Sequence, residues 1–204
     1  MEGYTLKFSI TQKDLYDALN IVRRAVAKNK TLPILTGIYL KLENNTLSLK
    51  TTDLELGIKY NLKVDSQEDG AVVLPAGQFL NIIRELPSEK IEMELNKDKW
   101  QMQIKCLNSL FKINGFDPDE FPSLPEVKES ARFTLPGVKF KSMLQKVRIS
   151  TSKDETQPAL TGALFVVKPE EVRMVSTNTY RLSYIDSPLK TEVADKVEVI
   201  LPGS

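Results

Sequence analysis

The sequence predicts an α+β fold in which a unit of one strand, one helix and three strands is repeated. The first observation is that residues 8–54 recur at residues 133–179, without a gap and at a constant offset of 125. The second is that the same order of strand, helix and three strands is predicted twice within residues 1–125, although the two occurrences share few identical amino acids. A fixed offset over so long a segment indicates one supersecondary module used more than once. The matching positions include Phe8/Phe133, Leu19/Leu144, Val22/Val147, Arg23/Arg148, Pro33/Pro158, Leu35/Leu160, Gly37/Gly162 and Thr52/Thr177.

The first half of the first copy begins with an alternating strand at 4–10. Thr11 offers a hydroxyl N-cap to a helix at about 13–27, whose apolar residues recur at helical spacing. Three strands are predicted after it, at 37–42, 46–51 and 54–64. The second half repeats this order, with a strand at 70–74, a helix at 78–86 and strands at 90–95, 100–106 and 109–115.

The second copy is predicted to open with a strand at Phe133 and Leu135, followed by a helix that runs to about Ile149. Strands are predicted at 162–167, 172–176, 180–187 and 196–201. The proline-rich, acidic segment 117–125 is interpreted as the connection between domains, ending near Lys128.

We therefore expect a complete domain at 1–125 and a second domain at 129–204 that is cut short about half way. We also expect this second domain to be the less stable one, because a missing helix and three strands leave a sheet edge and part of a core bare.

Composition limits the possible chemistry. The chain has 204 residues, no histidine and a single cysteine, Cys106. The commonest general base and metal ligand is therefore absent, and we expect neither a metal nor another cofactor. No apolar run reaches the length of a membrane span and no signal peptide is visible, so we expect no membrane partner. One cysteine is compatible with a reducing cytoplasm, where we expect the protein to lie.

No catalytic set is visible. Asp53 and Glu55 lie two residues apart, but the second copy has Asn178 and Tyr180 at these positions, so the carboxylate pair is not part of the repeat. The acidic cluster at 117–120 lacks the spacing of a calcium loop and is typical of a solvated turn. A Ser-His-Asp triad is impossible without histidine, and no glycine-rich phosphate loop occurs. The sequence predicts a protein that is not an enzyme.

Positive charge gathers at the first helix of each copy. Residues 13–30 hold five cations against Asp14 and Asp17, and residues 139–153 hold five cations and no acid. These two windows carry +8 together, so the rest of the chain carries −7 within a net charge of +1. A solvated helix face is the ordinary explanation for such a run. The same bias in two copies favours a basic strip that attracts phosphates without reading sequence.

Several short motifs in a fixed order carry a family resemblance. They are Thr31–Leu35 with Gly37, Thr52-Asp53-Leu54-Glu55, the segment Asn114–Pro122, Leu160-Thr161-Gly162, and Thr177 with Arg181-Leu182. The chain resembles the N-terminal part of the beta sliding clamp of bacterial DNA polymerase III, over essentially all 204 residues. The resemblance implies the DNA-clamp fold, with helices on the inner face and antiparallel sheets on the outer face, and three similar domains in each subunit.

The family implies a role in DNA replication. Two subunits form a head-to-tail homodimer ring around double-stranded DNA and act as a processivity factor. The ring tethers the replicative polymerase alpha subunit, and a clamp loader opens and closes it. As a subunit, the clamp is classed with DNA-directed DNA polymerases, which are transferases, although it has no active site.

The resemblance also implies site residues. Basic residues on the pore helices and the following loops face DNA; here they are Arg23, Arg24, Lys28, Lys30, Lys146, Arg148 and Lys153. Proteins with a clamp-binding motif insert an apolar peptide into a pocket on the second domain, next to the third. The matching positions are Leu160, Thr177, Thr179, Tyr180, Arg181 and Leu182. Asn178-Thr179-Tyr180 departs from the family's usual Asp-Gly-His or Asp-Ser-His. Since part of the pocket is expected beyond Ser204, we expect this chain to bind such peptides poorly.

Two rival interpretations remain. One is a repeat adaptor that binds peptides and has no DNA function, and the other is an unrelated α+β enzyme with a site between domains. The absence of histidine counts against the enzyme. The adaptor differs from the clamp in predicting no dependence on whether DNA is circular or linear.

Overall fold

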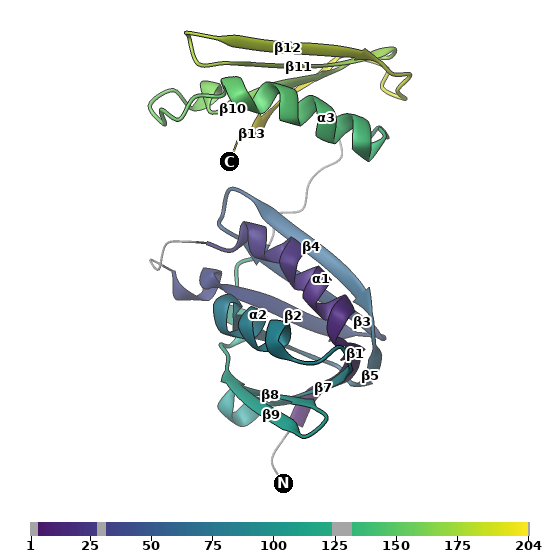
Figure 1. Ribbon diagram of the computed structural model, residues 1–204, viewed down its shortest axis with the longest axis vertical. Coiled ribbons are helices and arrows are strands. Elements are labelled where there is room, and N and C mark those ends of the chain that lie inside the picture. The colour runs from purple at the N-terminus through teal and green to yellow at the C-terminus, as the bar shows by residue number, and fades with distance from the viewer. Residues whose placement is uncertain (1–3, 28–31, 124–131, 204) are drawn as a thin grey trace. The chain divides into compact units, whose positions relative to one another are not determined.

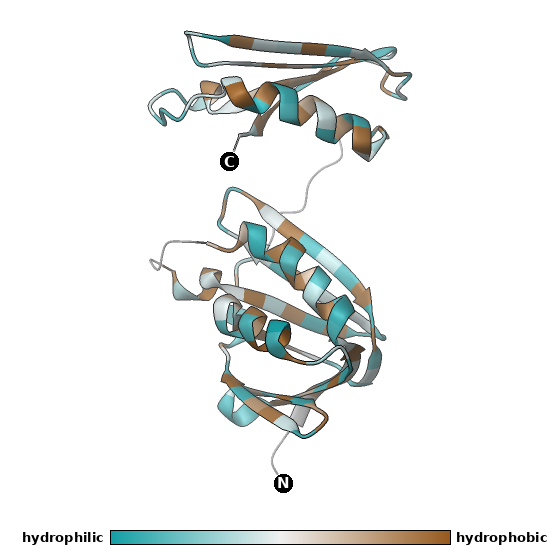
Figure 2. Cartoon of the chain, in the orientation of Figure 1, coloured by the Kyte–Doolittle hydropathy of each residue, from teal (hydrophilic) through white to brown (hydrophobic). Residues whose placement is uncertain are grey.

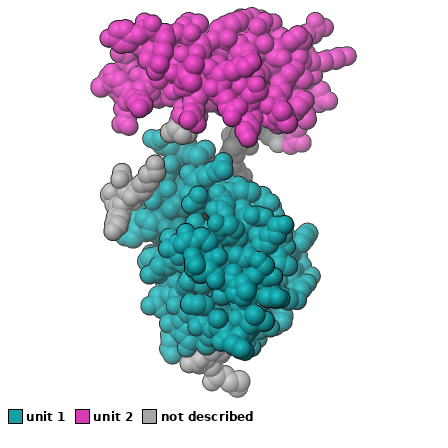
Figure 3. Space-filling model, in the orientation of Figure 1, with its two compact units in different colours: residues 1–125 teal, residues 126–204 magenta. Residues whose placement is uncertain are grey.

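A computed structural model of the chain describes residues 4–27, 32–123 and 132–203. The chain divides into two compact units, residues 1–125 (unit 1) and 126–204 (unit 2), which are coloured separately in Figure 3. No helix within the described part of the chain is long and apolar enough to cross a membrane.

Unit 1 contains two helices and nine strands among its described residues (Figure 1). Its first half comprises β1 (Tyr4–Thr11), α1 (Gln12–Val22), the 3-10 turn η1 (Arg23–Ala25), the 3-10 turn η2 (Pro33–Thr36), β2 (Gly37–Glu43), β3 (Thr46–Thr52) and β4 (Gly57–Lys63). A short strand, β5 (Asp65–Glu68), follows. The second half comprises β6 (Gly70–Pro75), α2 (Ala76–Glu85), β7 (Lys90–Asn96), the 3-10 turn η3 (Lys97–Lys99), β8 (Gln101–Cys106), β9 (Ser109–Asn114) and the 3-10 turn η4 (Pro118–Glu120).

The two halves of unit 1 exchange their first strands. One antiparallel sheet has the order β4-β3-β2-β6, so the opening strand of the second half completes the sheet of the first. The other has the order β5-β1-β7-β8-β9, so β1 in turn joins the sheet of the second half. Because each half completes the other's sheet, neither can bury its apolar faces alone.

One core joins both sheets and both helices. Helix α1 buries Leu15, Leu19 and Val22 against β3 and β4, and it packs beside α2. Figure 2 shows apolar and polar residues alternating along the strands, which leaves one apolar face for this core. Thr11 caps α1 as predicted, because its Oγ1 accepts a hydrogen bond of 3.2 Å from Asp14 N.

Two predictions for unit 1 need correction, and one strand was missed. The helix predicted at 13–27 ends at Val22 and continues only as η1. The strand predicted at 54–64 begins at Gly57, because residues 53–56 form a tight loop in which Leu54 has a φ of 77°. Strand β5 was not predicted, since its sequence DSQE lacks the apolar alternation on which strand prediction depends.

The acidic segment predicted as a connection is partly structural. Pro118–Glu120 form η4, and Phe121 after it is buried in a small cluster with Leu35 and Val73. Val73 also pairs with Phe116 through backbone hydrogen bonds of 3.2 and 2.8 Å. The segment up to Phe121 therefore belongs to the packed part of unit 1, and residues 124–131 lie outside the described residues.

Unit 2 repeats the first half of unit 1 with the same offset of 125. It comprises α3 (Gly137–Val147), the 3-10 turns η5 (Arg148–Ser150) and η6 (Pro158–Leu160), β10 (Gly162–Val167), β11 (Glu171–Thr177), β12 (Leu182–Pro188) and β13 (Val197–Pro202). The sheet order β12-β11-β10-β13 matches β4-β3-β2-β6. Between β12 and β13 the offset becomes 127, so that Gly162 pairs with Pro202 as Gly37 pairs with Pro75.

The strand predicted at Phe133 and Leu135 is absent, although both side chains still pack. Phe133 lies 5.9 Å from Phe165, measured between ring centroids, and Leu135 joins the same cluster. In unit 1 the equivalent strand, β1, pairs with β5 and β7. No strand among the described residues of unit 2 corresponds to either, so the backbone at 133–135 has no ladder to join.

Candidate nucleic-acid interface and peptide pocket

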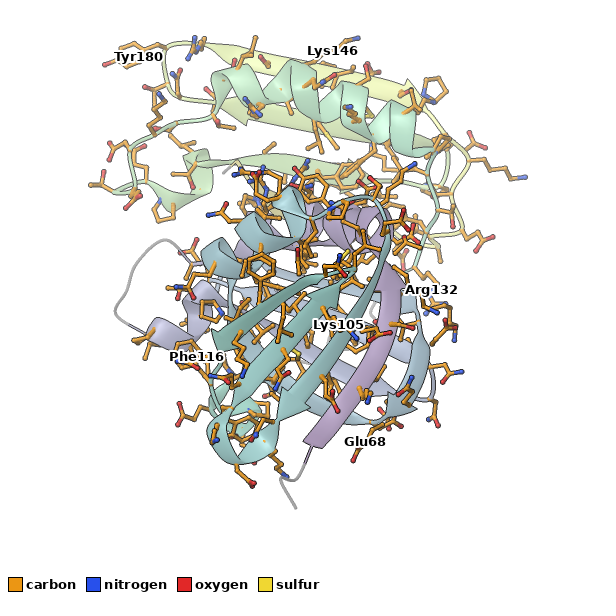
Figure 4. The ribbon with its side chains drawn as sticks, turned by 60° about the horizontal axis from the view of Figure 1, so that its bottom comes forward. Glu68, Lys105, Phe116, Arg132, Lys146 and Tyr180 are labelled. Carbon is orange, nitrogen blue, oxygen red and sulfur yellow. The ribbon has the colours of Figure 1, made fainter. Side chains whose placement is uncertain are left out.

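Four of the basic residues predicted to face DNA lie at the C-terminal ends of the repeated helices, and Lys153 lies in the loop after the second of them. Arg23 and Arg24 form the turn η1 after α1, and Arg148 begins the turn η5 after α3. Lys146 lies in the last turn of α3 (Figure 4). Arg23 and Arg148 are related by the 125-residue offset, so the repeat places the same charge at the same point of each unit.

These cations are exposed and uncompensated. Arg23, Arg24, Lys146, Arg148 and Lys153 are all exposed, and none has a carboxylate of the described residues within 4.0 Å. Cations at a helix C-terminus also interact favourably with the helix dipole, which accounts for about 0.3–1 kcal/mol each. That stabilisation needs no partner, so the guanidinium donors remain available to a ligand. Lys28 and Lys30 lie outside the described residues.

Lys139 of the same basic window is engaged elsewhere. Its Nζ donates a 2.8 Å hydrogen bond to Pro188 O at the end of β12. Lys139 is therefore bonded to the end of the sheet, whereas Lys146 in the last turn of α3 and Arg148 in η5 form no ion pair with a described carboxylate.

A buried hydroxyl fixes the end of each helix to its sheet. Thr51 Oγ1 in β3 donates 2.6 Å to Val22 O, and Ser176 Oγ in β11 donates 2.5 Å to Val147 O. The donors and the acceptors are each 125 residues apart. A C-terminal carbonyl of a helix has no partner within the helix, so these bonds satisfy a group that burial would otherwise leave unpaired. They also fix the backbone position of Arg23 and Arg148, which come directly after Val22 and Val147 in the chain.

The residues predicted to form the peptide pocket gather at one end of the unit 2 sheet. Thr177 ends β11 and Leu182 begins β12, and the two are paired across the ladder. Thr179, Tyr180 and Arg181 form the loop between them, and Leu160 lies at the end of η6, just before β10. Tyr180 is 95% exposed and Leu182 is 65% exposed, so both apolar surfaces face solvent. Figure 4 shows Tyr180 pointing outward at the tip of this loop.

Asn178, where the resembled family usually has Asp, holds this loop together. Its Oδ1 accepts from Tyr180 N at 3.3 Å and from Arg181 N at 3.1 Å, and its own N–H donates to Arg181 O. Thr177 Oγ1 accepts from Thr179 N and donates to Arg181 O. The loop residues are therefore positioned by their neighbours, and the side chains of Tyr180, Arg181 and Leu182 are exposed to solvent.

Unit 1 contains the same loop with a carboxylate in place of the amide. Asp53 Oδ1 accepts from Glu55 N at 3.1 Å and from Leu56 N at 2.7 Å, and Thr52 Oγ1 accepts from Leu54 N. Leu54 and Thr179, 125 residues apart, have φ values of 77° and 73°. Asp53 thus has a structural role in a turn. Among the described residues, no group of three or more carboxylates and cysteines could hold a metal ion.

The chain matches two family descriptions in sequence. Residues 6–125 match "DNA polymerase III beta subunit, N-terminal domain", and residues 134–204 match "DNA polymerase III beta subunit, central domain". The chain belongs to the DNA polymerase III beta subunit family. The resemblance drawn from the sequence motifs is therefore confirmed.

Relatives of known name are similar over nearly the whole chain. The chain is 32% identical over 206 residues to the beta sliding clamp of Staphylococcus epidermidis, and 27% identical over 197 residues to that of Chlamydia pneumoniae. Each alignment covers 97% of this chain and 54% of the relative. The chain thus spans about half the length of these beta subunit relatives.

Solved structures of clamps have the same fold. The DNA polymerase sliding clamp of Bacillus subtilis superposes with a TM-score of 0.91 at 27% identity, covering 98% of this chain and 54% of that one. A putative DNA polymerase III beta subunit from Eubacterium rectale gives 0.91 at 28% identity, covering 97% and 54%. The predicted clamp fold, with antiparallel sheets and few helices, is confirmed by these beta subunits.

Proposed function

We propose that this chain is part of a sliding clamp that encircles double-stranded DNA and tethers the replicative polymerase alpha subunit during DNA replication in the cytoplasm. The observation that carries this proposal is the pair Arg23 and Arg148, free cations at equivalent ends of two repeated helices. A clamp of the relatives' length has three such domains, which a clamp loader closes into a head-to-tail homodimer ring. Binding is then topological and electrostatic, and needs no catalytic group.

A free sheet edge supports ring assembly. Within the described part of the chain, strand β9 is the last strand of its sheet and pairs on one side only, with β8. Leu110 and Phe111 on this edge are both exposed. Unpaired edges that carry exposed apolar residues are templates for another chain unless they are protected. We therefore propose β9 as the edge through which a second subunit joins.

Removing the helix-end cations tests the DNA proposal. The variant Arg23→Ala/Arg24→Ala/Arg148→Ala should bind a 30-base-pair duplex more weakly, because every phosphate left without its cation lowers the dependence of log K on log salt by about 0.9. Fluorescence anisotropy at several salt concentrations measures this slope, which should fall by about 3. The matched control is Lys97→Ala/Lys105→Ala/Lys112→Ala, which removes three charges from exposed residues of the second half of unit 1. An equal change of slope in both variants would exclude the helix ends as the DNA-binding surface.

Ring enclosure separates the clamp from the peptide-binding repeat adaptor without DNA function. A full-length protein that carries this segment, loaded by a clamp loader, should remain on nicked circular DNA and be lost when the DNA is cut. Equal retention on both forms, measured by gel filtration, would reject the tether.

We also propose that the Tyr180–Leu182 loop with Leu160 and Thr177 receives the clamp-binding motif of the polymerase and of other clamp-binding-motif proteins. The equivalent place in unit 1 is filled by the chain itself, since Leu35, which corresponds to Leu160, is buried against Phe121. In unit 2, Leu160 is only partly buried. An apolar site that is covered in one copy and open in the other suits a peptide ligand.

Leu182→Ser in a full-length subunit should weaken binding of such a peptide by about tenfold, because the apolar surface that the leucine offers to the peptide is removed. Isothermal titration with a polymerase-derived motif peptide measures this. Leu107→Ser is the matched control, since Leu107 is also 65% exposed and belongs to unit 1. Weaker binding in the control, or unchanged binding in Leu182→Ser, would remove this loop from the pocket.

A further inference from the structure

A group of lysines lies on one face of the β4-β3-β2-β6 sheet of unit 1, the face that points away from helix α1. Leu40, Leu47 and Leu49 point into the core with α1, so the alternate residues of these strands point away from it. The outer lysine patch consists of Lys41 in β2, Lys50 in β3 and Lys59 in β4. Tyr39 pairs with Lys50 across one ladder and Lys50 pairs with Lys59 across the next, so the patch runs across three adjacent strands.

The charge of this patch is largely uncompensated. Lys41 forms an ion pair with Glu43 at 2.7 Å, whereas neither Lys50 nor Lys59 has a carboxylate within 4.0 Å in the described part of the chain. Like charges directly opposite each other in a sheet are destabilising. Burial lowers the pKa of Lys50, and the nearby charges of Lys59 and Lys41 lower it further. A bound anion would remove this repulsion.

The surroundings of the patch favour carboxylates over nucleic-acid bases. Lys50 Nζ lies 5.3 Å from the centroid of the Tyr39 ring, and the centroid of the Phe121 ring lies at the same distance. Because the Tyr39 ring already contacts these two groups, it offers no surface on which a base could stack. Ser48 Oγ, in β3 on the same face, is buried and has no hydrogen-bond partner among the described residues. Ser48 pairs with Lys41 and with Asn61, which places this free hydroxyl beside the patch.

The patch is specific to unit 1. At the positions 125 residues further on, unit 2 has Val166, Val175 and Tyr184 in place of the three lysines. The strand pairing is the same, since Val175 pairs with Tyr184 as Lys50 pairs with Lys59. The repeated cations at the helix ends thus belong to a function shared by both units, and the outer lysine patch does not.

We propose that the outer lysine patch of unit 1 binds an acidic segment of a partner protein. An extended peptide presents a side chain on one face about every 6.8 Å, and lysines opposite each other in a sheet stand about 5 Å apart at Cβ. Two successive carboxylates on one face of the peptide can therefore reach Lys50 and Lys59 through the flexible lysine stems. Lys63, on the same face of β4, donates a 2.9 Å hydrogen bond to Thr46 Oγ1. Among the described residues this leaves Lys50 and Lys59 as the unengaged cations of this face, fewer than the roughly 4–8 cations of a lipid-binding cluster.

The test compares two lysine pairs in the 204-residue chain. The patch variant is Lys50→Gln/Lys59→Gln, and the matched control is Lys97→Gln/Lys112→Gln, two exposed lysines of the second half of unit 1. The probe is fluorescein-labelled hexaglutamate, whose affinity is measured by anisotropy at low salt. We expect the patch variant to weaken binding by about fivefold or more, and the control by less than about twofold. Thermal melting checks that both variants fold.

Further measurements distinguish the possible ligands. In ¹⁵N correlation spectra, hexaglutamate should shift the amide signals of β3 and β4 around Lys50 and Lys59. A ten-residue thymidine oligonucleotide and phosphatidylserine vesicles serve as competitors, and neither should displace the peptide from the patch. Equal weakening in both variants, signal shifts confined to other strands, or tighter patch-dependent binding of the oligonucleotide or the vesicles would each overturn the proposal.

Discussion

The two units share one scaffold up to a definite point. Helix, 3-10 turn and the strands β2–β4 recur as α3, η5 and β10–β12, with the same sheet order and the same hydroxyl bond from Thr51 or Ser176 to the helix end. The turn loops at Asp53 and Asn178 also agree in having an Asx oxygen that accepts from two following backbone amides. The repeated sequence therefore gives the same local structure wherever all the contacting residues lie within the repeated segment.

The units differ in what covers the sheet. Val73 in β6 is fully buried against Leu35 and Phe121, while Ile200, at the same position of β13, is 51% exposed. The described core of unit 2 has eight buried apolar side chains, against twenty-six in the main core of unit 1. The comparison shows that burial depends on what the second half of a domain supplies, and that the repeated half provides only one side of the core.

The largest expected effect is a difference in stability between the units. Unit 2 should unfold at a lower urea concentration than unit 1, with a free energy of unfolding smaller by roughly 3 kcal/mol, because stability grows with the number of residues in a packed core. Hydrogen exchange followed by mass spectrometry measures both units in one sample. Amides of β10 and β11 should exchange before those of β2 and β3.

Limited proteolysis provides an independent check on this difference. Cleavage should appear first after about residue 128, where the sequence predicts the second domain to begin, and residues 1–125 should persist. Uniform protection along the chain, or earlier degradation of residues 1–125, would contradict the comparison.

The equivalent residues Val73 and Ile200 allow the two units to be compared through one side chain in each. Val73→Ala should destabilise unit 1 by about 2 kcal/mol, since it removes two methyl groups from a closed cluster and leaves a cavity. Ile200→Ala removes more carbon atoms yet should cost at most about 0.5 kcal/mol, since this side chain is half in water. Urea denaturation of each variant measures both values. Similar costs would mean that Ile200 is covered in solution.

Most of the fold could be predicted from the sequence, because the periodic elements are long enough to show their period. The strands at 37–42, 46–51 and 162–167, the helix at 78–86 and the end of the helix near Ile149 lie within two residues of their predicted bounds. The misses have physical reasons. The strand expected at Phe133 depends on partners from a second half-domain, and the start of β4 is set by the side chain of Asp53, which no apolar pattern reveals.

The candidate sites could be predicted less completely. The repeat alone placed Arg23 and Arg148 at equivalent positions, and the family resemblance supplied the loop from Thr177 to Leu182. The outer lysine patch was not predicted, because Lys41, Lys50 and Lys59 are nine residues apart in turn and come together only through the strand register. Strand pairing, and not spacing along the chain, creates this surface.

The smallest expected effect concerns the loop that the two units share. Asp53→Asn should change the free energy of unfolding of unit 1 by less than about 0.5 kcal/mol, because an amide oxygen can accept from Glu55 N and Leu56 N as Asn178 accepts in unit 2. Asp53→Ala removes the acceptor and should cost about 1 kcal/mol, comparable to removing a helix cap. Urea titration of both variants compares them. If Asp53→Asn lowered the free energy of unfolding as much as Asp53→Ala, the negative charge of Asp53 would itself stabilise unit 1. The loops at Asp53 and Asn178 would then share their backbone shape but differ in what stabilises them.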